Sequence, residues 1–225
     1  QPRSRGLGDV YKRQAPPPTE RLEAINKLAE LNVPVALRLQ PLIPNVNDSK
    51  DQIAELLREA RNNGAERVII ESIRVTKENP LKIKELTPYY SSKHVLSPTL
   101  NYKLKATREV KSIAENLGLK LYGCKEGFLN LYSEGSCCGI ENLENSTLRL
   151  TLKEIYNYLL KGESLEEALE KTSSKQYIES KLEALPKPIA KKVRFHYKKL
   201  VKTVNSKELK EICPPLHKLI TRQPQ

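Results

Sequence analysis

Two different periodicities alternate between residues 18 and 75, and this alternation most constrains the fold. Four apolar residues recur at helical spacing, namely Leu22, Ile25, Leu28 and Leu31. Residues 33–42 then alternate as a strand does, with Val35, Leu37 and Leu39 on one face and Ala36, Arg38 and Gln40 on the other. The pattern predicts a helix to about Leu31, followed by a strand that ends at the prolines Pro41 and Pro44.

The same helix–strand pair then repeats. Ser49 followed by Gln52 forms a capping-box pattern, and a second apolar stripe begins at Ile53 and ends before Gly64, a helix-stopping residue. That stripe consists of Ile53, Leu56, Leu57 and Ala60. Residues 67–75 read as another strand. Short connections in the order helix, strand, helix, strand predict an α/β fold with parallel strands and helical crossovers.

Polar residues occupy the C-terminal ends of both predicted strands. The candidate ligand-binding residues are Arg38, Gln40, Ser72 and Arg74. In a β/α barrel, ligands bind at this end of the strands. A buried Arg needs an anionic partner, so Arg38 and Arg74 either face a ligand or pair with an acid such as Glu71.

A family resemblance covers residues 15–75. It rests on Ala15-Pro16-Pro17-Pro18-Thr19-Glu20-Arg21-Leu22, on Val33-Pro34-Val35 and on Gln40-Pro41-Leu42-Ile43-Pro44-Asn45-Val46-Asn47-Asp48, and it continues through 64–68 and 73–75. This sequence resembles the second half of a radical S-adenosylmethionine (SAM) barrel, in the spore-photoproduct-lyase-like, "DNA repair photolyase" group. Residues 106–140 resemble the late helix and strand of such proteins more weakly.

The resemblance implies a fold and a chemistry. We expect the C-terminal half of a partial (β/α) radical SAM barrel followed by an α-helical C-terminal region. The parent enzyme would be a lyase-like DNA repair enzyme that uses a [4Fe–4S] cluster on a CxxxCxxC loop to cleave SAM to a 5′-deoxyadenosyl radical. The cysteines here are Cys124, Cys137, Cys138 and Cys213, and no three of them have that spacing. We therefore expect the cluster loop in a missing N-terminal half and no activity from this chain alone.

The first residues set the expected domain boundaries. Residues 4–14 resemble the translation of a transposase-type sequencing adapter, and the chain contains no Met. We expect 1–14 to be a non-native leader, with a disordered basic arm as the alternative. We expect 15–145 to be the barrel part and 146–225 the basic helical region.

Three cysteines lie around a glycine-rich segment. Cys124, Cys137 and Cys138 are candidates for an auxiliary metal site, because thiolates in one loop can ligate zinc or iron–sulfur clusters. Buried, inert cysteine is the alternative. Glu126 could instead belong to a substrate pocket, and Cys213 has only His217 nearby as a potential partner.

Residues 79–101 read as a long irregular loop, because Pro80, Pro88 and Pro98 interrupt it. Loops of this length are usually functional lids or disordered segments. Tyr89, Tyr90 and His94 could contact a substrate there. The alternative is that they are residues of a surface loop without a functional role. Four cysteines and the lack of a long apolar run favour a cytoplasmic protein without a membrane segment.

The net charge of +12 concentrates near the C-terminus, where residues 175–225 hold 13 Lys and Arg against 4 Glu. Candidate nucleic-acid contacts are Lys191, Lys192, Arg194, Lys198 and Lys199, which are interleaved with Phe195 and Tyr197. Cations with aromatics suit phosphate contact and base stacking to DNA or RNA; a solvated lysine-rich helix is the alternative. The alternative functions are therefore a nucleic-acid-binding module without chemistry and a cluster-free β/α-barrel lyase.

Overall fold

The computed structural model describes residues 16–78, 86–89, 92–123, 126–135, 138–139, 151–173 and 182–222. The expected leader, residues 1–14, therefore lies outside the described residues. The first part of the chain alternates helices and strands, in the order α2 (Pro18–Glu30), β1 (Ala36–Leu42), α3 (Lys50–Asn62), β2 (Arg67–Ser72), α4 (Leu100–Asn116) and β6 (Lys120–Gly123).

The three strands of this part form one parallel sheet in the order β1-β2-β6. The expectation of parallel strands joined by helical crossovers is confirmed. The local signals also hold: the Ser49 side chain accepts the Gln52 N–H at the start of α3. Gly64 has a φ of +99°, the left-handed conformation that glycine adopts just after a helix. β1 begins three residues later than predicted, at Ala36.

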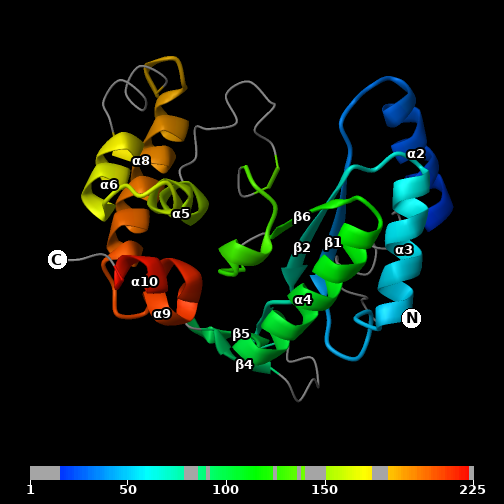
Figure 1. The fold of residues 1–225 in the computed structure, drawn as a ribbon, viewed down its shortest axis with the longest axis horizontal. Helices are drawn as coiled ribbons and strands as arrows, with labels where there is room; N and C mark the ends of the chain where they lie inside the picture. The colour runs from blue at the N-terminus through cyan, green and yellow to red at the C-terminus, as the bar shows by residue number, and fades with distance from the viewer. Residues whose placement is uncertain are drawn as a thin grey trace, which may run out of the picture.

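One face of the parallel sheet carries the hydrophobic core. In Figure 1, α3 and α4 lie side by side against the sheet of β1, β2 and β6. The apolar side chains that meet there are fully or almost fully buried, and they include Leu39, Leu57, Val68, Ile70, Val110 and Leu121. This face follows from the strand register, which pairs Leu37 with Val68 and Leu39 with Ile70.

A second, antiparallel sheet corrects the sequence prediction for residues 79–101. β5 (Ser92–Pro98) lies between β3 (Val75–Thr76) and β4 (Leu86–Tyr89). The predicted second strand, 67–75, therefore ends at Ser72, and Val75 joins this other sheet. The prolines were misleading because Pro88 lies on β4, an edge strand of the sheet, where a missing N–H is tolerated. Tyr90 lies outside the described residues, as does the side chain of Tyr89, and His94 is exposed.

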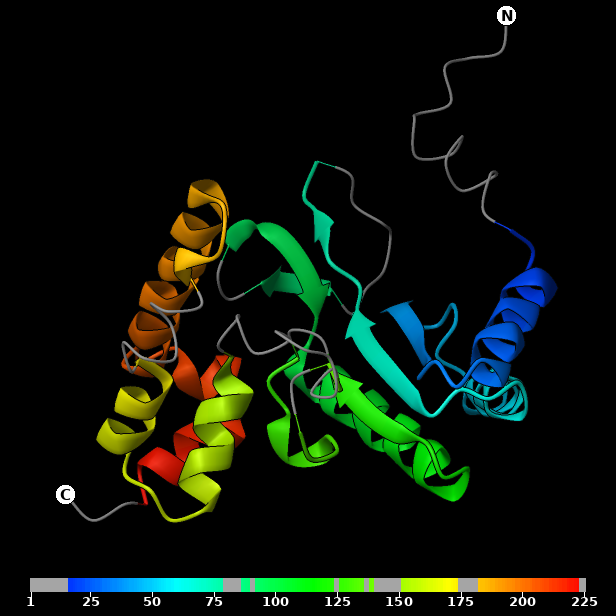
Figure 2. The same cartoon turned by 90° about the horizontal axis from the view of Figure 1, so that it is seen from above.

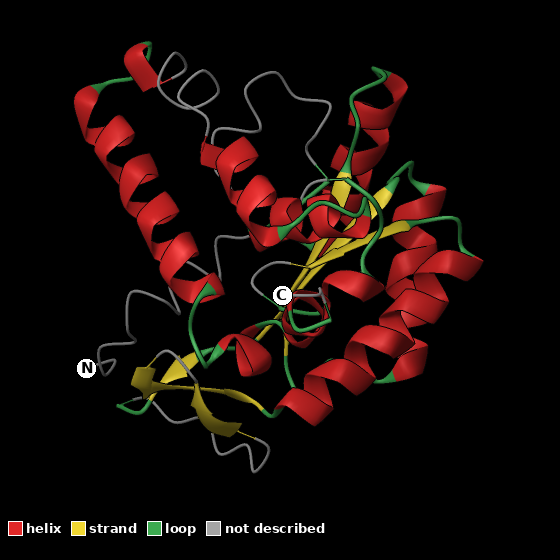
Figure 3. Cartoon of the chain, turned by 60° about the vertical axis from the view of Figure 1, so that its left-hand side comes forward, coloured by secondary structure: helices red, strands yellow, loops and turns green. Residues whose placement is uncertain are grey.

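The two small sheets remain separate, and the described strands do not close a barrel (Figure 3). The protein is thus a mixed α/β structure with a parallel sheet, which is coarser than the half-barrel that we expected. None of the described helices combines the length and the apolarity needed to cross a membrane.

The C-terminal part is helical, as predicted. A short 3-10 helix, η1 (Leu129–Leu131), precedes α5 (Leu152–Leu160), α6 (Leu165–Ser173), α8 (Lys187–Val204), α9 (Leu209–Ile212) and α10 (Pro214–Ile220). Figure 2 shows these C-terminal helices grouped on the side away from α2 and α3. The expected domain boundary near residue 145 lies outside the described residues.

The C-terminal helices meet the sheet region at a glycine. A Cβ built on Gly127 would overlap the carbonyl group of Ile212, so only glycine allows this close approach. The Cys213 Sγ also donates a hydrogen bond to the Gly127 carbonyl, at 3.2 Å. Buried residues of both regions, such as Leu121 and Leu216, belong to one hydrophobic cluster.

Substitution of Leu57 by alanine tests the core assignment. Leu57 is 0% exposed, so Leu57→Ala should lower the free energy of unfolding by about 2–5 kcal/mol through lost burial and a new cavity. The neighbouring Leu56 is 36% exposed, and Leu56→Ala should cost less than half as much. Urea unfolding followed by circular dichroism measures both. Equal losses in the two variants would contradict the orientation of α3.

Candidate active site

A buried polar cluster lies just beyond the C-terminal ends of β2 and β6. Its centre is the Glu126 carboxylate, which follows β6 in the chain and is almost fully buried. Oε1 of Glu126 accepts the backbone N–H of Ser72 at 2.8 Å, at the end of β2. The same oxygen lies 3.6 Å from Arg74 Nη2, and Oε2 lies 3.4 Å from Lys103 Nζ on α4. Two segments distant in sequence, residues 72–74 and α4, therefore converge on the carboxylate of a third.

Each cation of the cluster lies close to at least one carboxylate. Arg74 forms an ion pair with Glu71, as the sequence suggested, and also approaches Glu126. Burial lowers the pKa of Lys103, and the nearby Glu126 carboxylate acts in the opposite direction. A buried ion pair adds little net stability because desolvation is costly. Buried titratable groups of this kind occur more often at functional sites.

The four predicted ligand-binding residues do not come together on one face. Arg38 is exposed, and its Nε and Nη2 donate hydrogen bonds to Gln40 Oε1 at 3.0 and 2.7 Å. The register pairs Leu42 with Ser72, which places Ser72 on the helix-covered face, opposite Arg38 and Gln40. Arg74 lies after the strand rather than within it. The structure thus separates a Ser72–Arg74 group from an Arg38–Gln40 group.

Sequence reasoning named Glu126 only as a substrate-pocket alternative and missed Lys103. Lys103 lies on α4, a helix with polar residues on several sides. The spacing of apolar residues in this helix therefore did not predict that Lys103 is buried. Only the docking of α4 against the sheet removes this ammonium group from water.

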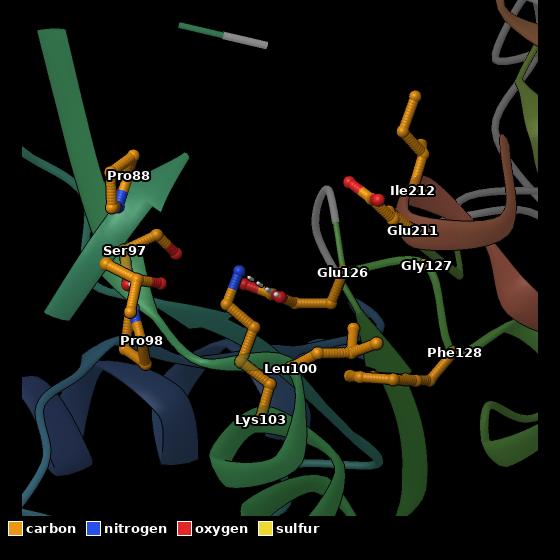
Figure 4. A pocket seen from close by; sticks show the side chains of 11 residues that line it. Pro88, Ser97, Pro98, Leu100, Lys103, Glu126, Gly127, Phe128, Glu211 and Ile212 are labelled. Carbon is orange, nitrogen blue, oxygen red and sulfur yellow. Dashed lines mark hydrogen bonds and ion pairs between the residues drawn. The ribbon is translucent and has the colours of Figure 1, made fainter. Parts of the chain in front are cut away.

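A cavity of about 240 Å³ opens beside the cluster (Figure 4). Lys103 and Glu126 form part of its wall, and the other walls come from the β4–β5 hairpin, the segment after β6 and α9. In Figure 4, the Lys103 ammonium group points toward the Glu126 carboxylate at the edge of this space. A concave site with a few convergent polar groups is the usual form of a small-molecule site.

The described residues do not form a metal site from the predicted cysteines. Cys124 and Cys137 lie outside the described residues, and Cys138 is half-buried. Within the described ranges, no group of three His, Cys, Asp or Glu side chains could hold a metal ion. Burial raises the pKa of the Cys213 thiol to about 12, so this cysteine stays protonated and poorly reactive. The auxiliary metal site stays a prediction.

The predicted nucleic-acid residues all lie on α8. Lys191, Lys192, Arg194, Lys198 and Lys199 are exposed, and the buried residues of α8 are Ala190, Leu200 and Val204. The helix therefore packs through one face and presents its cations to solvent.

The Glu126 cluster predicts a large difference between two glutamate substitutions. Glu126→Gln removes a buried charge opposite Lys103 and Arg74, and it should lower the free energy of unfolding by about 3–5 kcal/mol. Glu66→Gln is the control, because Glu66 is exposed and lies 4.0 Å from Arg67; it should cost less than about 1 kcal/mol. Chemical denaturation measures both. A Glu126→Gln variant as stable as the wild type would show that the carboxylate does not hold the cluster together.

Comparisons of this chain with protein-family models, with curated proteins and with solved structures found no match. No relative therefore supplies functional residues. The features that bear on function are the geometry of the cluster and its cavity, together with the motif resemblance in residues 15–75.

Proposed function

We propose that the chain is the C-terminal part of a β/α-barrel enzyme of the radical SAM class. One observation carries the proposal: three parallel strands are joined by helices on one face, and polar groups converge beyond the strand ends. In β/α barrels the active site lies at this end of the strands. The cluster around Glu126 therefore lies where such an enzyme would carry out its chemistry.

The open edge of β1 favours the same proposal. Arg38 and Gln40 alternate with Leu39 of the helix-covered core, so they project from the opposite face of β1, which would be the interior of a barrel. Among the described strands, β1 pairs only with β2, so one of its edges is open to a further strand. A preceding strand in the same protein would cover that edge and complete the curved sheet.

The residues of this chain do not fit the iron–sulfur cluster. No three cysteines have the CxxxCxxC spacing, and the described residues offer no alternative set of three ligands. We therefore propose that the ligands of the cluster lie on a preceding segment.

The residues fit SAM better. Gln40 Nε2 is buried and has no hydrogen-bond partner among the described residues, and the Arg38 guanidinium group is exposed beside it. These two donors would hold oxygen atoms of SAM at the inner face of β1. When bound at a reduced cluster, SAM supplies a 5′-deoxyadenosyl radical. The role of this chain would be to bind and orient SAM and to exclude water from the site.

The test uses the complete reading frame, recovered upstream of the Ala15 codon and reconstituted anaerobically with iron and sulfide. We expect 5′-deoxyadenosine to form from SAM after reduction. Arg38→Ala combined with Gln40→Ala should weaken SAM binding by about tenfold or more and leave the iron content unchanged. Arg58→Ala, on the exposed side of α3, is the control and should behave as wild type. A reconstituted protein that binds no cluster and forms no 5′-deoxyadenosine would exclude the proposal.

A second candidate function, nucleic-acid binding, is favoured by the surface of α8. This helix contains seven Lys and Arg residues and no Asp or Glu. Phe195 is 64% exposed, and exposed lysines precede and follow it by three and four positions. Residues at these spacings are neighbours on a helix. An aromatic ring surrounded by cations suits a single strand, because bases stack on the ring while phosphates contact the lysines.

The salt dependence of binding separates the phosphate contacts made by the lysines of α8 from base stacking on Phe195. Lys198→Gln should weaken binding of a labelled oligonucleotide and reduce the slope of log K against log salt by about one unit. Phe195→Ala should weaken binding by roughly 1–3 kcal/mol and leave the slope unchanged. Lys207→Gln, outside α8, is the charge-matched control. Fluorescence anisotropy at several KCl concentrations measures all three, and a wild-type slope near zero would remove this function.

A further inference from the structure

The cavity beside the Glu126 cluster is built from four segments that are distant in sequence. They are the β4–β5 hairpin, the first turn of α4, residues 126–128 and α9. Its volume of about 240 Å³ is below the roughly 300–1,000 Å³ of sites for drug-sized ligands. The cavity therefore has room for a small metabolite of about the size of an amino acid.

Most of the cavity wall is apolar. The lining apolar side chains are Pro88, Pro98, Leu100, Phe128 and Ile212. Proline rings are rigid and Phe128 is buried, so this part of the wall is already formed before a ligand binds. Such a wall favours a ligand with a short apolar substituent.

Two hydrogen-bond donors lie on one side of the cavity. Ser97 is 2% exposed, and its Oγ has no hydrogen-bond partner among the described residues. A buried hydroxyl without a partner costs about 1–3 kcal/mol, and a ligand that accepts a hydrogen bond from it would remove this cost. The Lys103 ammonium group lies in the same wall, beside Glu126.

A carboxylate lies on the other side. In Figure 4, Glu211 and Ile212 lie across the cavity from Ser97 and Pro98. No ion pair involves Glu211 within the described part of the chain, and its side chain is exposed. Glu126 is less available, because its two oxygens already contact Ser72, Arg74 and Lys103.

The opposed charges restrict the ligand. A simple anion would be attracted by Lys103 but repelled by Glu126 and Glu211. A simple cation would be attracted by Glu211 but would give the Ser97 hydroxyl no acceptor for its hydrogen bond. A molecule with a negative end and a positive end satisfies both sides of the cavity.

We propose that this cavity binds a small zwitterion of the α-amino-acid type. The ligand carboxylate contacts Lys103 and Ser97, the ammonium group contacts Glu211, and an aliphatic side chain packs against the prolines and Phe128. This inference does not depend on the radical SAM proposal, because it uses only the cavity of this chain.

The test compares three matched probes by isothermal titration calorimetry on the full 225-residue chain. Leucine is the zwitterion, 4-methylpentanoate lacks the ammonium group, and 3-methylbutylamine lacks the carboxylate. Leucine should bind about tenfold or more tightly than either analogue, because each analogue leaves one charged hydrogen bond unmade. Equal or tighter binding of either analogue, or no binding of leucine, would overturn the proposal.

Two variants test which side of the cavity contacts the carboxylate of the ligand and which contacts its ammonium group. Both variants should fold normally. Ser97→Ala removes a hydroxyl that has no partner, and Glu211 is exposed. Glu211→Gln should abolish the preference for leucine over 4-methylpentanoate. Ser97→Ala should weaken the binding of leucine and of 4-methylpentanoate by several-fold, but it should not change the binding of 3-methylbutylamine. Glu208→Gln removes the same charge three residues away, outside the cavity, and should bind as wild type. Wild-type binding by the Glu211→Gln variant would refute the proposed orientation.

Discussion

The buried Glu126 carboxylate is the interaction on which the arrangement of this protein depends. It accepts a backbone N–H from the end of β2, and it pairs with Arg74 after β2 and with Lys103 on α4. Removal of this one charge would leave two cations in a poorly solvated position. The carboxylate thereby fixes the segment after β6 against both β2 and α4, and the parallel sheet, its covering helix and the cavity share this contact.

The second constraint is the close approach at Gly127. Because a side chain there would overlap the Ile212 carbonyl, glycine is required for α9 to reach the segment after β6. The neighbouring Cys213 is buried and donates to the Gly127 carbonyl, which ties the same two segments together. The C-terminal helices consequently do more than add a basic surface. Through α9 they provide one wall of the cavity beside Glu126 and Lys103.

Two surfaces with different chemistry result from this arrangement. The cavity is small, largely apolar and lined by buried groups of both charges, which suits a small ligand. The exposed side of α8 is cationic, with Phe195 among its lysines, and suits an extended polyanion. The face of β1 that carries Arg38 and Gln40 is a further polar surface, and it bears on the proposal of a barrel enzyme that binds SAM.

The sequence by itself determined the local elements of this protein. Alternation of residues 35–40, the apolar stripe of α3 and the stop at Gly64 predicted the helices and parallel strands, because these signals depend on neighbouring residues. The Arg74–Glu71 pair and the exposed cations of α8 followed from the same local reasoning. Only the tertiary structure decided that Ser72 faces away from Arg38, that residues 86–98 contribute an antiparallel hairpin, and that Lys103 is buried beside Glu126. Burial of a charge depends on which distant segments pack over it, and neither periodicity nor composition contains that information.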